Sequence, residues 1–115
     1  MVKKIVQLEG LVLFLLSLFF YNTASANWIL FVILLFTPDI SMIGYLKDKK
    51  IGAMVYNSIH NYMLAGILML LGFAADYALL YEIGLILFAH VSLDRFIGFG
   101  LKYPSAFKDT HIQRL

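Results

Sequence analysis

Apolar residues dominate four stretches of the chain, at about residues 5–21, 28–46, 51–73 and 78–100. Short polar stretches separate them at residues 22–27, 47–50 and 74–77, and a polar tail follows residue 100. Each apolar stretch is close to the roughly 20 residues that a helix needs to cross a bilayer. The pattern therefore predicts an all-α fold, an integral membrane four-helix bundle with up-down-up-down order and short connections.

Composition agrees with a membrane protein. Hydrophobic residues make up 62% of the 115 residues and charged residues 14%, whereas soluble domains have about half and about a quarter. Four passes use nearly the whole length, so we expect a single domain over residues 1–115 with a short cytoplasmic tail at about 101–115. Residues 1–26 imitate a cleaved signal peptide, but Gln7 and Glu9 interrupt its apolar region, so we expect an uncleaved first helix. The absence of cysteine excludes disulfides and thiolate ligands.

Basic residues gather at one end of the predicted bundle. They fall at the N-terminus, in the second connection and in the tail, as Lys3, Lys4, Lys47, Lys49, Lys50, Lys102, Lys108 and Arg114. The first and third connections contain none. Because Lys and Arg are retained on the cytoplasmic side of a membrane, we expect both termini in the cytoplasm. The net charge of +2 is too small to indicate a nucleic acid, and the expected partner is the lipid bilayer.

The second apolar stretch contains Thr37-Pro38-Asp39. Proline removes a helix donor and clashes with the preceding turn, so we expect a kink or break at this point. Broken backbone inside a membrane is tolerated where it is buried in protein or lines a wet cavity.

Two aspartates and two histidines lie within the apolar stretches: Asp39, His60, His90 and Asp94. Such groups cost several kcal/mol in a membrane, so they indicate a site. His60 and His90 each lie about 14 Å from the same end of the bundle at 1.5 Å per residue. His90 and Asp94 are four residues apart and share a helix face. We predict that the four side chains meet in a pocket open to the cytoplasm.

Two imidazoles and two carboxylates are a suitable ligand set for zinc, manganese or iron. A bound metal would lower the pKa of a water molecule and supply a nucleophile for hydrolysis. The alternative is a hydrogen-bonded network without a ligand, in which Asp94 orients His90 and Asn57 bonds to His60. The pattern leaves both open, and it identifies no catalytic residue.

Further polar residues are expected to support this pocket. Tyr56, Asn57, His60 and Asn61 are spaced to form one polar stripe on a continuous third helix. We expect Glu9 to be a buried partner. Arg95 is expected either to pair with Asp94 or Asp39 or to reach lipid phosphates.

The tail residues Asp109 and His111 have two equal interpretations. Either the tail folds back so that one of them completes the coordination or delivers a proton, or the tail lies on anionic lipid.

Three segments, PDISMIGY from Pro38, YNSIHNY from Tyr56 and HVSLDRFIGFGLKYPSAFKDTHIQRL from His90, resemble a family of short bacterial membrane proteins known as domain of unknown function 4260. The resemblance spans nearly the whole chain and implies a multi-pass protein of the bacterial inner membrane, with no activity attached. A looser similarity to membrane-bound metal-dependent hydrolases rests on Pro38-Asp39 and a His/Asp pair. It implies Asp39, His60, His90 and Asp94 as metal ligands, although the paired histidines of that group are missing here.

The function that these observations favour is divalent-metal binding, with hydrolysis as the expected chemistry. One alternative is a transporter of small molecules or ions built as a homo-oligomer, in which Glu9 would act as in small multidrug exporters. A second is a haem held between His60 and His90. A third is a non-catalytic protein that binds another membrane protein through Gly84, Gly98 and Gly100.

Overall fold

The computed structural model describes residues 1–24, 27–104 and 110–115. Its elements are α1 (Val2–Ala24), α2 (Trp28–Leu35), the 3-10 helix η1 (Thr37–Leu46), α3 (Lys49–Ile59), α4 (Tyr62–Ala74) and α5 (Ala78–Ile97). Lys102 and Thr110 form an isolated antiparallel bridge, and the described residues contain no strand. The all-α prediction is confirmed.

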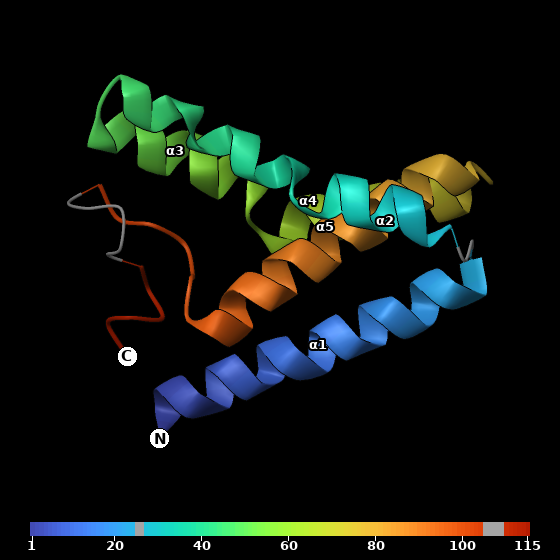
Figure 1. The fold of residues 1–115 in the computed structure, drawn as a ribbon, viewed down its shortest axis with the longest axis horizontal. Helices are drawn as coiled ribbons and strands as arrows, with labels where there is room; N and C mark the ends of the chain where they lie inside the picture. Colours follow the sequence, from blue (N-terminus) through green and yellow to red (C-terminus); the bar gives the residue numbers. More distant parts are fainter. Residues whose placement is uncertain (25–26, 105–109) are drawn as a thin grey trace.

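The helices run back and forth along the long axis of the molecule (Figure 1). α1 runs in one direction, α2 and η1 return, α3 and α4 run out again, and α5 returns. The two termini lie at the same end, where Nζ of Lys3 donates a hydrogen bond to Oε1 of Gln113 at 2.7 Å. The chain therefore runs along this axis four times in alternating directions, and we call each run a pass.

Three of these passes are long and apolar enough to cross a membrane: Val2–Ala24, Trp28–Leu46 and Lys49–Ala74. Large apolar side chains point outward from them. Ile29, Met63 and Phe73, for example, are 75%, 75% and 79% exposed. An apolar surface of this extent is unfavourable in water and suited to lipid. Length, composition and surface together support membrane association.

α5 is the central helix, and α1, α2 and α4 all pack against it. Small residues allow the close approach. A Cβ added to Gly10 of α1 would lie 2.8 Å from the backbone nitrogen of Phe96, and one added to Gly84 would lie 2.7 Å from the backbone nitrogen of Met69. Glycine at these contacts lets the helix backbones approach, as in other membrane helix pairs.

The three glycines that one alternative assigned to a surface for another protein instead contact other parts of the same chain. Gly84 faces α4, Gly100 faces the ring of His111, and Gly98 faces Gln113. Gly98 also ends α5 with a φ of 101°, a left-handed conformation that favours glycine at this position. The alternative that these three positions form an external interface is therefore wrong, because other segments of the chain cover them.

Polar side chains define where three of the helices begin. The side chains of Asn27, Asp48 and Asn61 each accept a hydrogen bond from the backbone N–H three residues further on. These are N-cap bonds, which satisfy a donor that the first turn of a helix leaves unpaired.

The second pass is broken where the sequence predicted. α2 ends at Leu35, and the chain continues from Thr37 as the 3-10 helix η1, with Pro38 in its first turn. Proline is tolerated in a first turn, where no intrahelical donor is required. The break carries Asp39 at the start of the new helix.

The third pass is also broken, which corrects the expectation of one continuous helix with a polar stripe. α3 ends at Ile59, and α4 begins at Tyr62. His60 has φ −91° and ψ 55°, and Asn61 has φ −139° and ψ 154°, so neither is helical. The cause is Asn61, which caps α4 and donates to two carbonyls at the end of α3. Asparagine competes for backbone hydrogen bonds in this way and favours helix ends.

The tail folds back against the ends of α1 and α5. The backbone N–H of His111 donates to the carbonyl of Leu101 at 2.9 Å, and Nε2 of Gln113 donates to the carbonyl of Gly98 at 2.8 Å. Thr110 and Ile112 are fully buried. The tail is thus part of the folded domain, and it holds the chain just after α5 in place.

Candidate metal centre

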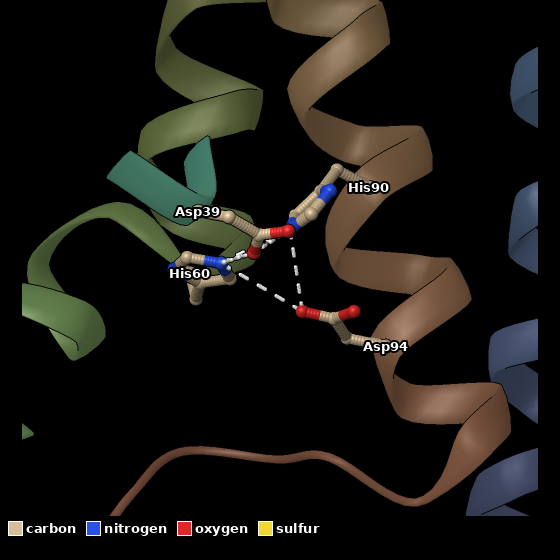
Figure 2. Close-up of side chains that lie close together, drawn as sticks. All are labelled: Asp39, His60, His90 and Asp94. Atoms are coloured by element: carbon tan, nitrogen blue, oxygen red, sulfur yellow. Dashed lines mark hydrogen bonds and ion pairs between the residues drawn. The ribbon is translucent and has the colours of Figure 1, made fainter. Parts of the chain in front are cut away.

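Asp39, His60, His90 and Asp94 converge as predicted, and Figure 2 shows their side chains pointing toward one another. Asp39 comes from η1, His60 from the break between α3 and α4, and the other two from successive turns of α5. His60 and His90 are buried, with 1% and 2% exposure, whereas the carboxylates are partly exposed. The two helix breaks therefore bring one ligand each to a face of α5.

The four potential ligand atoms form a compact group. Nε2 of His60 and Nε2 of His90 are 3.0 Å apart. Oδ1 of Asp39 lies 3.4 and 3.2 Å from these nitrogens, and Oδ2 of Asp94 lies 3.7 and 3.3 Å from them. All four atoms are within 4.8 Å of one another. Ligands at about 2.0–2.1 Å from a tetrahedral metal are about 3.3–3.4 Å apart, which is close to this spacing.

The same geometry does not fit a haem. Axial nitrogens on opposite sides of an iron, each at about 2 Å, are about 4 Å apart and face each other across the porphyrin. The His60 and His90 nitrogens are 3.0 Å apart, and the Asp39 and Asp94 carboxylates lie beside both of them.

His60 is held in the tautomer that binds metals. Its Nδ1 lies 3.1 Å from the carbonyl oxygen of Tyr56. Because a carbonyl only accepts hydrogen bonds, we assign the proton to Nδ1, which leaves the lone pair of a neutral ring on Nε2. That lone pair faces Nε2 of His90 and Oδ1 of Asp39. Such a carbonyl contact is the usual outer support of a metal-binding histidine.

Tyr56 also supports the centre directly. Its hydroxyl donates to Oδ2 of Asp94 at 3.2 Å. Its ring stacks on His60 with the centroids 3.7 Å apart and the planes 7° from parallel. Nδ1 of His90 is buried and has no hydrogen bond of regular geometry within the described ranges, although the carbonyl of Leu35 influences this ring.

Three other predicted residues lie near the centre and bond to the backbone around it, not to the four side chains. Asn61 caps α4, and Arg95 donates long hydrogen bonds to the carbonyls of His60, at 3.5 Å, and Phe99, at 3.4 Å. Arg95 is buried, and in the part of the chain that the structure describes it forms no ion pair, contrary to the expected pairing or lipid contact. Asn57 bonds to the backbone of residue 102 rather than to His60, the role expected in a ligand-free network.

The remaining predicted residues are not brought to the centre. Glu9 is exposed and lines a groove on the surface of α1, because the buried face of that helix carries Gly10, Ser17 and Tyr21. The ring of His111 lies against Gly100, and its Nδ1 accepts from the backbone of residue 101. Burial, and then the charge of Arg95, lowers the pKa of His111. Asp109 lies outside the described residues.

A cavity of about 230 Å³ adjoins the centre. Asp39, His90 and Asp94 form part of its wall, together with Tyr56 and Lys102. In the sequence Lys102 is one of the basic residues that predict a cytoplasmic C-terminus, and no local pattern predicts that it lines a cavity. Its burial follows from the return of the tail, since Lys102 pairs with Thr110 in the isolated bridge.

The fold and the centre define a class of protein: a helical protein with membrane-type passes and a buried His/Asp group that could hold a metal ion. The chain matches the family DUF4260, described as a domain of unknown function, over residues 3–115, and it belongs to that family. The family resemblance inferred from the three segments is thereby confirmed. Comparison with curated proteins and with solved structures returned no match. Function is therefore argued from the site.

Proposed function

We propose that this is a bacterial inner-membrane protein that binds one divalent metal ion through Asp39, His60, His90 and Asp94, and that the centre catalyses hydrolysis. The observation that carries the proposal is the convergence of two imidazole nitrogens and two carboxylate oxygens within 4.8 Å. Burial of both histidines and the carbonyl contact of His60 add support.

A divalent cation fits the group better than protons alone. The lone pair on Nε2 of His60 faces other acceptors, which is unfavourable unless positive charge lies between them. A proton on Nε2 of His90 can form a good hydrogen bond with only one of its three close neighbours: His60, Asp39 or Asp94. One metal ion interacts with all four atoms at once.

The hydrolytic part rests on the cavity beside three of the ligands. With all four residues bound, a catalytic metal would need a fifth position for water, and the cavity next to Asp39, His90 and Asp94 provides the space. A bound metal would supply an activated water molecule. Tyr56 would hold Asp94 in place through its hydroxyl. The expected substrates are phosphate esters, amides or lipid headgroups that enter from the cytoplasmic leaflet.

The orientation follows from the distribution of positive charge. Both termini lie at the end of the molecule that carries the second connection, with Lys47, Lys49 and Lys50. The positive-inside rule then favours a cytoplasmic location for this end and for both termini.

The decisive experiment measures metal content by mass spectrometry on protein purified in detergent without chelators and reloaded with zinc, manganese or iron. We expect about one ion per chain in the wild type and its loss in His60→Gln and Asp94→Asn. Matched controls are His111→Asn, which retains an acceptor for the backbone, and Asp76→Asn, which tolerates the φ of 54° at that position. Metal-free wild-type protein after reloading would refute the proposal. Activity on ester and phosphate-ester substrates should follow metal content.

Transport by a homo-oligomer is a second candidate, which the two broken passes favour. Broken helices create ion sites at membrane depth in many transporters. This function predicts metal flux into proteoliposomes, with loss of flux in His60→Gln, whereas a hydrolase carries no flux. A purely structural or interaction role instead predicts a wild type that binds no metal and that tolerates substitution of the four residues.

A further inference from the structure

We propose that Lys102 anchors a phosphate group of the substrate in the cavity beside the metal centre. This inference rests on the proposed function, because the metal-loaded centre forms one wall of that cavity. The observations that carry it are the position of Lys102 in the cavity wall, the way its backbone is fixed, and the charge of the lining.

Lys102 is 4% exposed, which is unusual for a lysine that follows a helix at a membrane surface. Its Nζ lies 4.4 Å from the centre of the Tyr56 ring and 5.3 Å from that of Phe99. The same Tyr56 donates its hydroxyl to Asp94. One aromatic ring thus contacts both the lysine and a carboxylate of the metal centre.

Its backbone is fixed on two sides. Asn57 accepts from the N–H of Lys102 through Oδ1 at 2.7 Å and donates to its carbonyl through Nδ2 at 2.8 Å. The bridge to Thr110 adds a third restraint. A lysine that served only to retain the tail on the cytoplasmic side would need none of these contacts. They are the kind of restraint expected around a binding residue.

The charge of the lining favours an anion. A divalent cation would cancel the charges of Asp39 and Asp94, and among the described residues of the wall the remaining formal charge would be the positive charge of Lys102. Burial lowers the pKa of Lys102, while Asp94 and Asp39 act in the opposite direction. A phosphate oxygen at Nζ would form a charge-assisted hydrogen bond with this ammonium group.

The size of the cavity limits what enters. Its volume of about 230 Å³ is below that of sites for drug-sized ligands, which begin at about 300 Å³. It suits a phosphate group with a few neighbouring atoms. The phosphate belongs either to a lipid headgroup, with acyl chains left in the bilayer, or to a small water-soluble phosphate ester.

The test measures binding of inorganic phosphate and of short-chain phosphatidic acid to metal-loaded protein in detergent, by titration calorimetry. Lys102→Met removes the charge and keeps the aliphatic stem, whereas Lys102→Arg keeps the charge. Lys47→Met, at an exposed position, is the matched control. We expect Lys102→Met to weaken phosphate binding at least about tenfold with unchanged metal content, and Lys102→Arg to stay within about threefold of the wild type.

Tighter binding of phosphatidic acid than of inorganic phosphate, lost in Lys102→Met, supports the lipid headgroup, and equal binding of both supports a soluble ester. Unchanged phosphate binding in metal-loaded Lys102→Met overturns the inference and leaves the metal centre intact. Loss of metal in that variant also overturns it, because Lys102 would then maintain the centre itself. A wild type that binds no metal overturns both proposals, and a metal-loaded wild type that binds neither probe overturns only this one.

Discussion

Asn61 holds the break in the third pass, and Asn61→Ala tests the break without touching a ligand. Its Oδ1 accepts from the N–H of Leu64 at 2.8 Å, and its Nδ2 donates to the carbonyls of Asn57 at 2.7 Å and Ser58 at 3.1 Å. The variant loses all three hydrogen bonds. Since alanine is the best helix former, it also removes the local obstacle to a continuous helix through His60.

The magnitude follows from these contacts. Loss of an N-cap bond costs about 1 kcal/mol. The part-buried bond to Asn57 contributes about another 1 kcal/mol, and the exposed bond to Ser58 much less. We therefore expect the free energy of unfolding to fall by about 2 kcal/mol. If all of this free energy is lost from the placement of His60, the metal dissociation constant rises about 30-fold, since about 1.4 kcal/mol corresponds to tenfold.

The assay combines zinc competition against a chromogenic chelator with thermal unfolding in detergent, with and without metal. Ser58→Ala is the matched control, because its exposed hydroxyl donates only along α3, to the carbonyl of Met54 at 2.7 Å. Wild-type zinc affinity together with wild-type stability in Asn61→Ala would refute the argument that Asn61 maintains the break and thereby positions His60.

Two other predictions concern packing and the tail. Gly84→Ala should lower the free energy of unfolding by about 1 to 3 kcal/mol, because the added Cβ would meet the Met69 backbone. Gly66→Ala, which has open space around it, should leave the free energy of unfolding unchanged or raise it by up to about 1 kcal/mol. Equal thermal unfolding of the two variants would contradict this. Because the pKa of His111 is lowered from 6.5 in the folded protein, protonation favours the unfolded tail, so its contribution to stability is complete above pH 6.5 and decreases as the pH falls through the folded pKa. His111→Asn should therefore lose less stability than the wild type between pH 7 and pH 5, and parallel pH profiles would count against this.

The four passes and one of the two breaks follow from local sequence signals. Proline excludes a helix interior through its own ring, so Pro38 predicts its break without knowledge of the surroundings. Asn61 gives a weaker signal, because asparagine favours helix ends without excluding a helix interior, and the apolar residues after it continue the pattern. Its effect depends on two carbonyls of the preceding turn that accept from its amide.

The sequence predicted which four residues form the candidate centre, but it did not predict the residues that surround them. Depth along antiparallel helices was enough to bring Asp39, His60, His90 and Asp94 together. The prediction that Glu9 is buried was wrong, because the small residues of α1 determine which side of this helix packs against α5, and Gly10 lies on that side. Lys102 was missed because its burial depends on the tail's return across the end of α5, which no local pattern encodes.

The central position of α5 has a consequence for biogenesis. The helix that α1, α2 and α4 pack against follows all three in the chain and so leaves the ribosome after them, and it carries two of the four candidate ligands, His90 and Asp94. The inward faces of the earlier helices therefore stay uncovered until α5 has been synthesised, several seconds at about 5–20 residues per second. A chain truncated before α5 would have neither the two buried clusters nor the candidate centre, so both can form only once this helix has joined the others.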